Sequence, residues 1–230
     1  MAGVADFVFL IDGTGSMKPC MDALKENISI FFESLADAQT PVTDWRGKVV
    51  TYRDQKVDGS HWFEDNDFVA NDEVALKAQL DKLEEKGGGD EPESALDALH
   101  KVATMTIAEE GTQDVSVNGW RHQSSKAARL IILFTDATYH PVMTYGEAEG
   151  GTVEDVISAF HTNRIMPILY APDHELWDAV GAIDKAEYQP IGGPDFAMGL
   201  ENYVADKNNF RKVMEALAKS ISQSSPVEVL

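Results

Sequence analysis

Three continuous apolar runs, rich in β-branched and aromatic residues, constrain the fold of this chain more than any other feature. They span residues 7–11, 130–134 and 165–170. Strands with continuous rather than alternating apolar residues are typically buried on both faces, as in a parallel sheet covered by helices. The sequence therefore predicts a central, mostly parallel sheet that contains these three segments.

Segments with the apolar period of a helix lie between and after these runs. The predicted helices span residues 17–35, 71–85, 93–108, 152–163, 175–183 and 206–222, and two further strands are expected near residues 48–52 and 187–191. Strands that alternate with helices predict a doubly wound, Rossmann-like α/β fold with helices on both faces of the sheet. No repeat or linker divides the chain, so we expect one domain over residues 1–230, with its core at about 4–222 and a frayed tail at 223–230.

The net charge of the chain disfavours some classes of binding partner. It has 39 Asp and Glu against 19 Lys and Arg, a net charge of −20. Such a surface repels phosphate backbones and anionic lipid headgroups, which disfavours nucleic-acid and membrane partners. A single cysteine, the lack of a signal peptide and the lack of an apolar run of about 20 residues favour a cytoplasmic protein. The acidic excess serves either solubility alone or, in part, a cation site.

Two predicted strands end in an aspartate. The first runs into Asp12, Thr14 and Ser16, and the strand at 130–134 runs into Asp136. In open α/β sheets, ligands bind beyond the carboxyl ends of the strands, where the strand order reverses. Hydroxyl and carboxylate oxygens without nitrogen or sulfur ligands suit Mg²⁺ or Mn²⁺ rather than softer metals. The pattern predicts a metal site with hard oxygen ligands.

These loops resemble those of a known family. Asp12, Thr14 and Ser16 resemble the Asp-x-Ser-x-Ser signature of the metal-ion-dependent adhesion site in von Willebrand factor A (vWA) domains, with threonine in place of one serine. The run from Asp90 to Glu93 resembles the Asp-x-Pro-Glu loop of integrin β subunits, and residues 135–140 resemble their Thr-Asp-Ala-x-Phe-His stretch. The resemblance covers roughly residues 4–222.

The resemblance implies a vWA fold and a ligand set. By the match to the family motif, Mg²⁺ or Mn²⁺ would be held by Asp12, Thr14, Ser16 and Asp136. Glu93 or Asp90 would lie nearby or be joined to the ion through water. In the family, a protein partner supplies an aspartate or glutamate to the open coordination position. The resemblance therefore implies a non-catalytic protein-interaction module.

The integrin-like loops also imply a second site. Asp54, Asp90 and Glu93 match the carboxylates that hold a neighbouring structural Ca²⁺ in integrin β subunits, but Gly88 replaces an asparagine ligand. The alternative is that Asp54 pairs with Arg53 or caps a helix N-terminus.

Other interpretations of the main motifs remain open. Asp12, Thr14 and Ser16 could cap the following helix without binding a metal, although carboxylates with no basic residue in the motifs would then repel one another. An Asp-Gly-Thr run after a strand is also superficially like the nucleophile loop of haloacid dehalogenase phosphatases, which makes a metal-dependent phosphohydrolase the catalytic alternative. Those enzymes need a second aspartate two residues away, where this chain has Leu10 and Thr14, so we predict no enzyme. The last alternative is an assembly subunit that binds no metal.

Two further expectations concern individual side chains. Trp62 and Phe63 lie in the polar segment 55–66, where exposed aromatic residues would be available to a partner. His140 follows the third loop, and we expect a hydrogen-bonded loop histidine there rather than a residue of the metal face.

Overall fold

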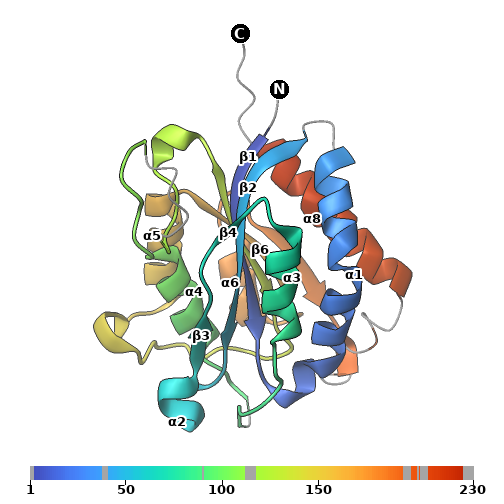
Figure 1. The fold of residues 1–230 in the computed structure, drawn as a ribbon. Helices are drawn as coiled ribbons and strands as arrows, with labels where there is room; N and C mark the ends of the chain where they lie inside the picture. Colours follow the sequence, from blue (N-terminus) through green and yellow to red (C-terminus); the bar gives the residue numbers. More distant parts are fainter. Residues whose placement is uncertain are drawn as a thin grey trace.

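A sheet of seven strands forms the centre of the molecule (Figure 1). The computed structural model describes residues 3–37, 41–89, 91–111, 118–193, 198–200, 202 and 207–224. The strands are β1 (Gly3–Asp12), β2 (Val42–Tyr52), β3 (Phe63–Asp65), β4 (Val69–Ala70), β5 (Ala128–Phe134), β6 (Ile165–Pro172) and β7 (Glu187–Ile191). Their order is β3-β2-β1-β5-β6-β7, and β4 pairs with β2.

Most of the strand pairs are parallel. β1 pairs in parallel with β2 and with β5, and β6 continues the parallel arrangement to β7, whereas β3 and β4 run antiparallel to β2. After β1 the chain first builds outward on the β2 side and then crosses to β5 on the other side of β1. The strand order therefore reverses between β1 and β5, which is where a doubly wound sheet places its ligands.

Helices cover both faces of this sheet. They are α1 (Lys18–Asp37), α2 (Gln55–Asp58), α3 (Glu73–Asp81), α4 (Ala95–Ala103), α5 (Val153–Asn163), α6 (Glu175–Gly181) and α8 (Lys207–Ser224), with a 3-10 turn η1 (Gly15–Met17) before α1 and η3 (Gln123–Ser125) before β5. Helices α1, α3 and α8 lie on one face and α4, α5 and α6 on the other (Figure 1). Their side chains form the two cores against the sheet. The structure confirms the predicted doubly wound, mostly parallel α/β fold.

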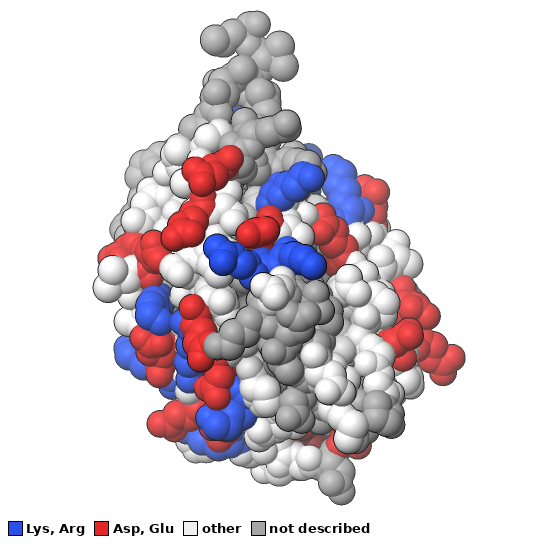
Figure 2. All heavy atoms as spheres, turned by 90° about the vertical axis from the view of Figure 1, so that its right-hand side faces the viewer, with Lys and Arg blue, Asp and Glu red and all other residues white. Residues whose placement is uncertain are grey.

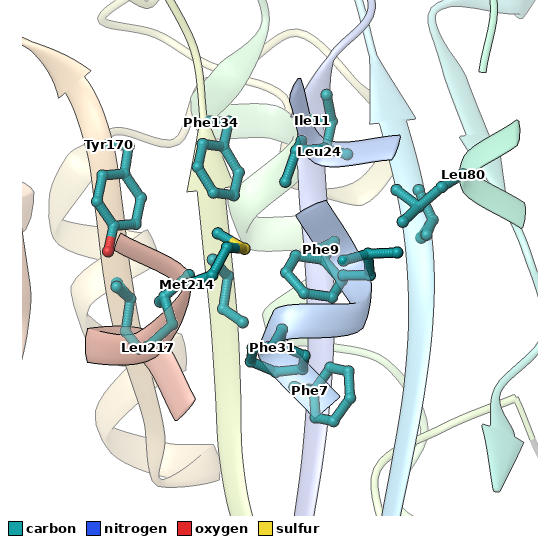
Figure 3. Close-up of a cluster of buried hydrophobic side chains, with 14 of the residues drawn as sticks. Phe7, Phe9, Ile11, Leu24, Phe31, Leu80, Phe134, Tyr170, Met214 and Leu217 are labelled. Carbon is teal, nitrogen blue, oxygen red and sulfur yellow. The ribbon is translucent and has the colours of Figure 1, made fainter. Parts of the chain in front are cut away.

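The continuous apolar run in β1 is explained by the two cores it separates. Phe7, Phe9 and Ile11 point into the core beneath α1 and α8 (Figure 3), while Val8 and Leu10 point to the α4 and α5 side. All five are completely buried, and each large side chain contributes about 1.5–3 kcal/mol when removed from water. A strand with only one buried face would need polar residues at every second position.

Element boundaries differ from the predictions where capping and pairing decide them. α3 begins at Glu73 because the Asp72 side chain accepts the amide of Ala75. Val74 follows the apolar period of the predicted helix 71–85 but is 79% exposed. The polar segment 55–66 is not a plain loop, since it contains α2 and β3. The predicted frayed tail starts at 223, whereas α8 continues to Ser224; residues 225–230 lie outside the described residues.

The charged surface on the side of the molecule that carries α1 and α8 is mixed (Figure 1 and Figure 2). Figure 2 shows acidic and basic side chains interspersed over this face rather than gathered into one acidic patch. Lys18, for example, pairs with Asp22 at 3.3 Å and with Glu85 at 3.0 Å. Exposed pairs of this kind contribute about 0–1 kcal/mol each, so they have little effect on stability. Within the described ranges, no helix combines the length and hydrophobicity needed to cross a membrane.

Candidate metal centre

Asp12 lies at the point where the strand order reverses. It is the last residue of β1, it is completely buried, and its register partner on β2 is Tyr52. On the other side Ile11 pairs with Phe134, so the next residue, Thr135, lies beside Asp12 and donates its hydroxyl to Asp12 Oδ2 at 2.8 Å. Thr135 was not among the predicted site residues. The parallel register of two strands that each run into a polar residue is the signal that identifies it.

The loop after Asp12 places two hydroxyls above the carboxylate. The amide and the hydroxyl of Thr14 both donate to Asp12 Oδ1, at 3.0 and 2.8 Å, and Ser16 Oγ lies 3.3 Å from Thr14 Oγ1. Thr14 is 6% exposed, whereas Ser16 is exposed. Thr14 precedes η1, yet its side chain forms no capping hydrogen bond in the described structure. The alternative of a pure capping role therefore gains no support for Thr14.

The second loop reaches Thr14 through a glycine. Gly88 has a φ of +70°, and a Cβ there would lie 2.5 Å from Thr14 Cγ2 and 3.0 Å from Glu93 Oε1. Asp58 Oδ2 holds the loop in place by accepting the amide of Gly88 at 2.8 Å. A side chain at residue 88 would push Thr14 and Glu93 apart, so the glycine allows the two loops to meet. Asp90, predicted in this loop, lies outside the described residues.

Glu93 is fixed between the second and third loops. Its backbone amide donates to Thr138 O at 3.0 Å, and its carbonyl accepts the amide of His140 at 3.0 Å. The side chain is 3% exposed, and Oε2 has no hydrogen-bond partner among the residues that the structure describes. Asp136, in the same third loop, is 5% exposed. A buried carboxylate oxygen without a donor is costly unless something else satisfies it.

The acidic side chains of the three loops influence one another. The pKa of Asp12 is raised to about 7, chiefly by burial and then by the nearby Asp136 carboxylate, against the opposing hydrogen bonds from Thr135 and Thr14. The pKa of Glu93 is likewise raised to about 8, chiefly by burial and then by repulsion from Asp12 and Asp54. Both shifts mean that the negatively charged forms are disfavoured in the protein by itself. A bound cation would favour those forms instead.

The donor set combines hydroxyls and carboxylates. Within the described part of the chain, no three Asp, Glu, His or Cys side chains converge closely enough to hold an ion without other ligands. The structure does bring Asp12, Thr14 and Ser16 together by hydrogen bonds. Asp136 is close enough to raise the pKa of Asp12, and Asp12 is close enough to raise the pKa of Glu93. Such a set of hard oxygens fits Mg²⁺ or Mn²⁺, which accept neutral hydroxyl and water ligands beside a carboxylate.

Asp54, predicted for a second metal, is held by other partners. Its side chain caps α2 by accepting the amide of Lys56 at 3.0 Å, and Oδ1 also accepts the Ser94 hydroxyl at 3.2 Å and lies 3.0 Å from His140 Nε2. The structure thus shows the capping alternative for Asp54. Arg53 does not pair with it but donates to Gly13 O at 3.3 Å. The Ca²⁺ site remains a prediction.

His140 and Trp62 resolve the two expectations about individual side chains. His140 Nδ1 lies 3.1 Å from the Lys56 ammonium group, which can only donate, so Nε2 carries the proton shared with Asp54. This confirms a hydrogen-bonded loop histidine. The expectation of an exposed Trp62 is wrong, because Trp62 is 7% exposed and packs against Phe63 and Tyr145 at centroid distances of 5.1 and 5.8 Å.

One protein-family model matches part of this chain. Residues 6–112 match the family model described as the von Willebrand factor A domain. The match supports a vWA domain. The matched segment includes Asp12, Thr14, Ser16 and Glu93, whereas Asp136 lies beyond it.

A comparison with solved structures gives a distant likeness. A crystal structure of the pilus adhesin SpaC from Lactobacillus rhamnosus GG, in an open conformation, is 14% identical to this chain, with a TM-score of 0.48. The alignment covers 93% of this chain and 30% of the adhesin chain, so this chain spans less than a third of the adhesin. Among curated proteins, none matches this chain.

Proposed function

We propose that this chain is a non-catalytic vWA-type module that binds Mg²⁺ or Mn²⁺ and, through that ion, an acidic side chain of a partner protein. The observation that carries the proposal is the set of acidic and hydroxyl side chains around Asp12. This buried carboxylate lies beside Asp136 and Glu93, below the hydroxyls of Thr14 and Ser16. The vWA match fits an interaction module.

The proposed ligands are Asp12, Thr14, Ser16 and Asp136. Glu93 would lie nearby or act through water, and Asp90 is the alternative for that place. When bound, the ion supplies a fixed positive charge at the edge of the sheet. Because Thr14 and Ser16 are neutral, they would leave part of that charge uncompensated, and it would attract a carboxylate even to a chain with a net charge of −20.

The surroundings of the site offer apolar contacts for such a partner. Val57 is 57% exposed, and a Cβ on Gly89 would lie 3.0 Å from Val57 Cγ2, so this valine borders the second loop. Val142, 47% exposed, follows His140, which contacts α2 through Lys56. Exposed apolar side chains around a charged anchor are typical of binding surfaces. We propose that they help select the partner.

The catalytic alternative gains no support from the residues around Asp12. Two positions after it stands Thr14, whose hydroxyl donates to Asp12. A phosphatase of the kind considered above would need a carboxylate there as acid and base. We therefore propose binding rather than phosphoryl transfer.

Metal dependence is tested first by calorimetry. Chelator-treated protein is titrated with Mg²⁺ and with Mn²⁺, and we expect saturable binding that Thr14→Ala and Asp136→Ala weaken or abolish. Thr104→Ala and Asp81→Ala, at exposed positions just after α4 and at the end of α3, are matched controls that should bind as the wild type does. Absence of binding up to millimolar metal would refute the site and favour an assembly subunit without metal.

Partner binding is tested separately. A partner recovered from lysate should be lost in EDTA, restored by Mg²⁺ and displaced by high concentrations of acetate, which competes as a carboxylate. Thr14→Ala and Asp136→Ala should lose it while circular dichroism shows an intact fold, because both residues lie on loops above the sheet. If folded variants without metal retain the same partner at the same affinity, the partner binds another surface.

A further inference from the structure

A second charged region lies at the other end of the same sheet. Asp6 of β1 pairs in register with Arg46 of β2 and with Arg129 of β5. Side chains alternate along a strand, so these three residues lie on the face that also carries Val8 and Leu10 and is covered by α4 and α5. The amino ends of three adjacent strands therefore bring a buried acid and two arginines together.

The carboxylates of this region already form ion pairs with two arginines. Arg46 donates to both Asp6 oxygens, at 3.0 and 2.6 Å, and Arg121 Nε lies 3.2 Å from Asp6 Oδ1. Arg121 also pairs with Asp44 at 2.7 Å. Two carboxylates thus balance Arg46 and Arg121. Arg129 instead donates to backbone carbonyls, that of Asn163 at 2.7 Å and that of Arg121.

A cavity of about 210 Å³ opens beside Arg129. Arg164 and His122 also line it, and its remaining wall is polar apart from Ile107. Among the described residues that line the cavity, none is acidic, and within the described ranges no carboxylate lies within ion-pair distance of Arg129 or Arg164. The cavity is therefore positively charged in a chain whose net charge is −20.

Neighbouring charges make this cluster unfavourable in the protein by itself. Burial lowers the pKa of the Arg129 guanidinium, Asp6 raises it, and the positive charges of Arg164 and Arg46 lower it. Arg129 is only 8% exposed, so water screens its charge poorly. An anion in the cavity would relieve the repulsion between Arg129 and Arg164.

The end of α5 does not repel such an anion strongly. Carbonyl groups at a helix C-terminus carry partial negative charge, but here they are already bound. Arg129 donates to the carbonyl of Asn163, and the backbone amide of Arg164 donates to the carbonyls of His161 and Phe160. The positive side chains therefore dominate the local field.

We propose that this cavity binds a phosphate group, either as free phosphate or on a small phosphate monoester. Guanidinium groups donate in a planar fork that matches the oxygens of a phosphate, and paired arginines are favoured where phosphate is recognised. A volume of about 210 Å³ leaves room for a phosphate with a small substituent. This site is independent of the metal centre, because it lies at the opposite end of β5.

Arg164 provides an unusually clean test. It adopts a φ of 54°, the left-handed conformation that favours glycine at the end of a helix. Arg164→Gly therefore removes a charge from the cavity while it eases the backbone of the α5 cap. Arg129→Gln is the second variant, and Arg211→Gln, an exposed arginine on α8 at the other face of the sheet, is the matched control.

The experiment is calorimetry of metal-free protein with inorganic phosphate and with glycerol phosphate, at constant ionic strength set by chloride. We expect one equivalent to bind, with affinity lowered about tenfold or more by Arg164→Gly and by Arg129→Gln, and unchanged by Arg211→Gln. Tighter binding of glycerol phosphate would assign the site to a monoester, and equal binding would assign it to phosphate itself. Wild-type protein without saturable binding, or Arg164→Gly with wild-type affinity, would overturn the proposal.

Discussion

The two ends of β1 each carry a completely buried aspartate in opposite surroundings. Asp6 and Asp12 lie six residues apart on the same face of the strand, a separation of about 20 Å. Asp6 forms ion pairs with two arginines, Arg46 and Arg121. Among the described residues, Asp12 accepts from neutral donors alone, Thr14 and Thr135, and the charged group that shifts its pKa is another acid, Asp136.

The difference contrasts an acid that is neutralised within the fold with an acid that the proposed metal would neutralise. A buried carboxylate is costly unless a cation accompanies it. At the amino end, the chain itself supplies the cations, so Asp6 belongs to the structure of the fold. At the carboxyl end, the chain supplies hydroxyls and more carboxylates, so Asp12 is suited to a cation taken from solution. The comparison predicts that equivalent substitutions at the two ends have different consequences.

The largest effect is expected from Asp6→Ala. It would leave the buried Arg46 and the partly buried Arg121 beside each other without their shared acid, which should lower the free energy of unfolding by about 3–5 kcal/mol. Urea denaturation with and without Mg²⁺ measures this, and the loss should be independent of the metal. Asp44→Ala is the control, because Asp44 is half exposed and its pair with Arg121 should contribute under about 1 kcal/mol. An Asp6→Ala protein as stable as Asp44→Ala would break the comparison.

A smaller effect, of opposite character, is expected from Asp12→Asn. The metal-free variant should be as stable as the wild type or more stable, because one buried negative charge beside Asp136 is removed. Wild-type protein should gain about 2.7 kcal/mol at a hundredfold excess of Mg²⁺ over its dissociation constant, and the variant should gain none. Thermal melts in EDTA and in Mg²⁺ measure both. If EDTA leaves the wild-type melt unchanged, Asp12 is a structural acid like Asp6.

The last effect is the pH dependence of the metal-free protein. The pKa values of Asp12 and Glu93 are raised to about 7 and about 8 from ordinary values of 3.8 and 4.5. The folded chain therefore holds protons that the unfolded chain has released, so the stability they contribute is complete below about pH 4 and is lost as the pH rises through 7 to 8.

Denaturation of chelator-treated protein between pH 5 and 8 tests this slope. Saturating Mg²⁺ should flatten it, because the ion stabilises the ionised carboxylates. Asp12→Asn should reduce the slope without metal, which distinguishes these groups from the other acids of the chain. A slope that is the same in Asp12→Asn and in the wild type would mean that other groups control the pH dependence.

The sequence alone determined the sheet and the position of the main loops. Continuous apolar runs marked β1, β5 and β6 because a strand buried on both faces tolerates no polar alternation. Asp12 and Asp136 could be assigned to one edge because parallel strands end together. Patterns along the chain were less reliable for surface contacts: Val74 follows the helical period but is exposed, and Trp62 lies in a polar segment but is buried.

Only the tertiary structure decided which groups meet. Thr135 donates to Asp12 across 123 positions of the chain, and Gly88 allows Glu93 to approach Thr14. Asp54 matched a metal ligand by position, yet it caps α2 through the Lys56 amide and contacts Ser94 and His140. These contacts depend on strand register and on the packing of loops that are distant in sequence, and no local pattern encodes either. The sequence therefore determined where acids gather, and the fold decided that Asp6 meets arginines and Asp12 meets hydroxyls.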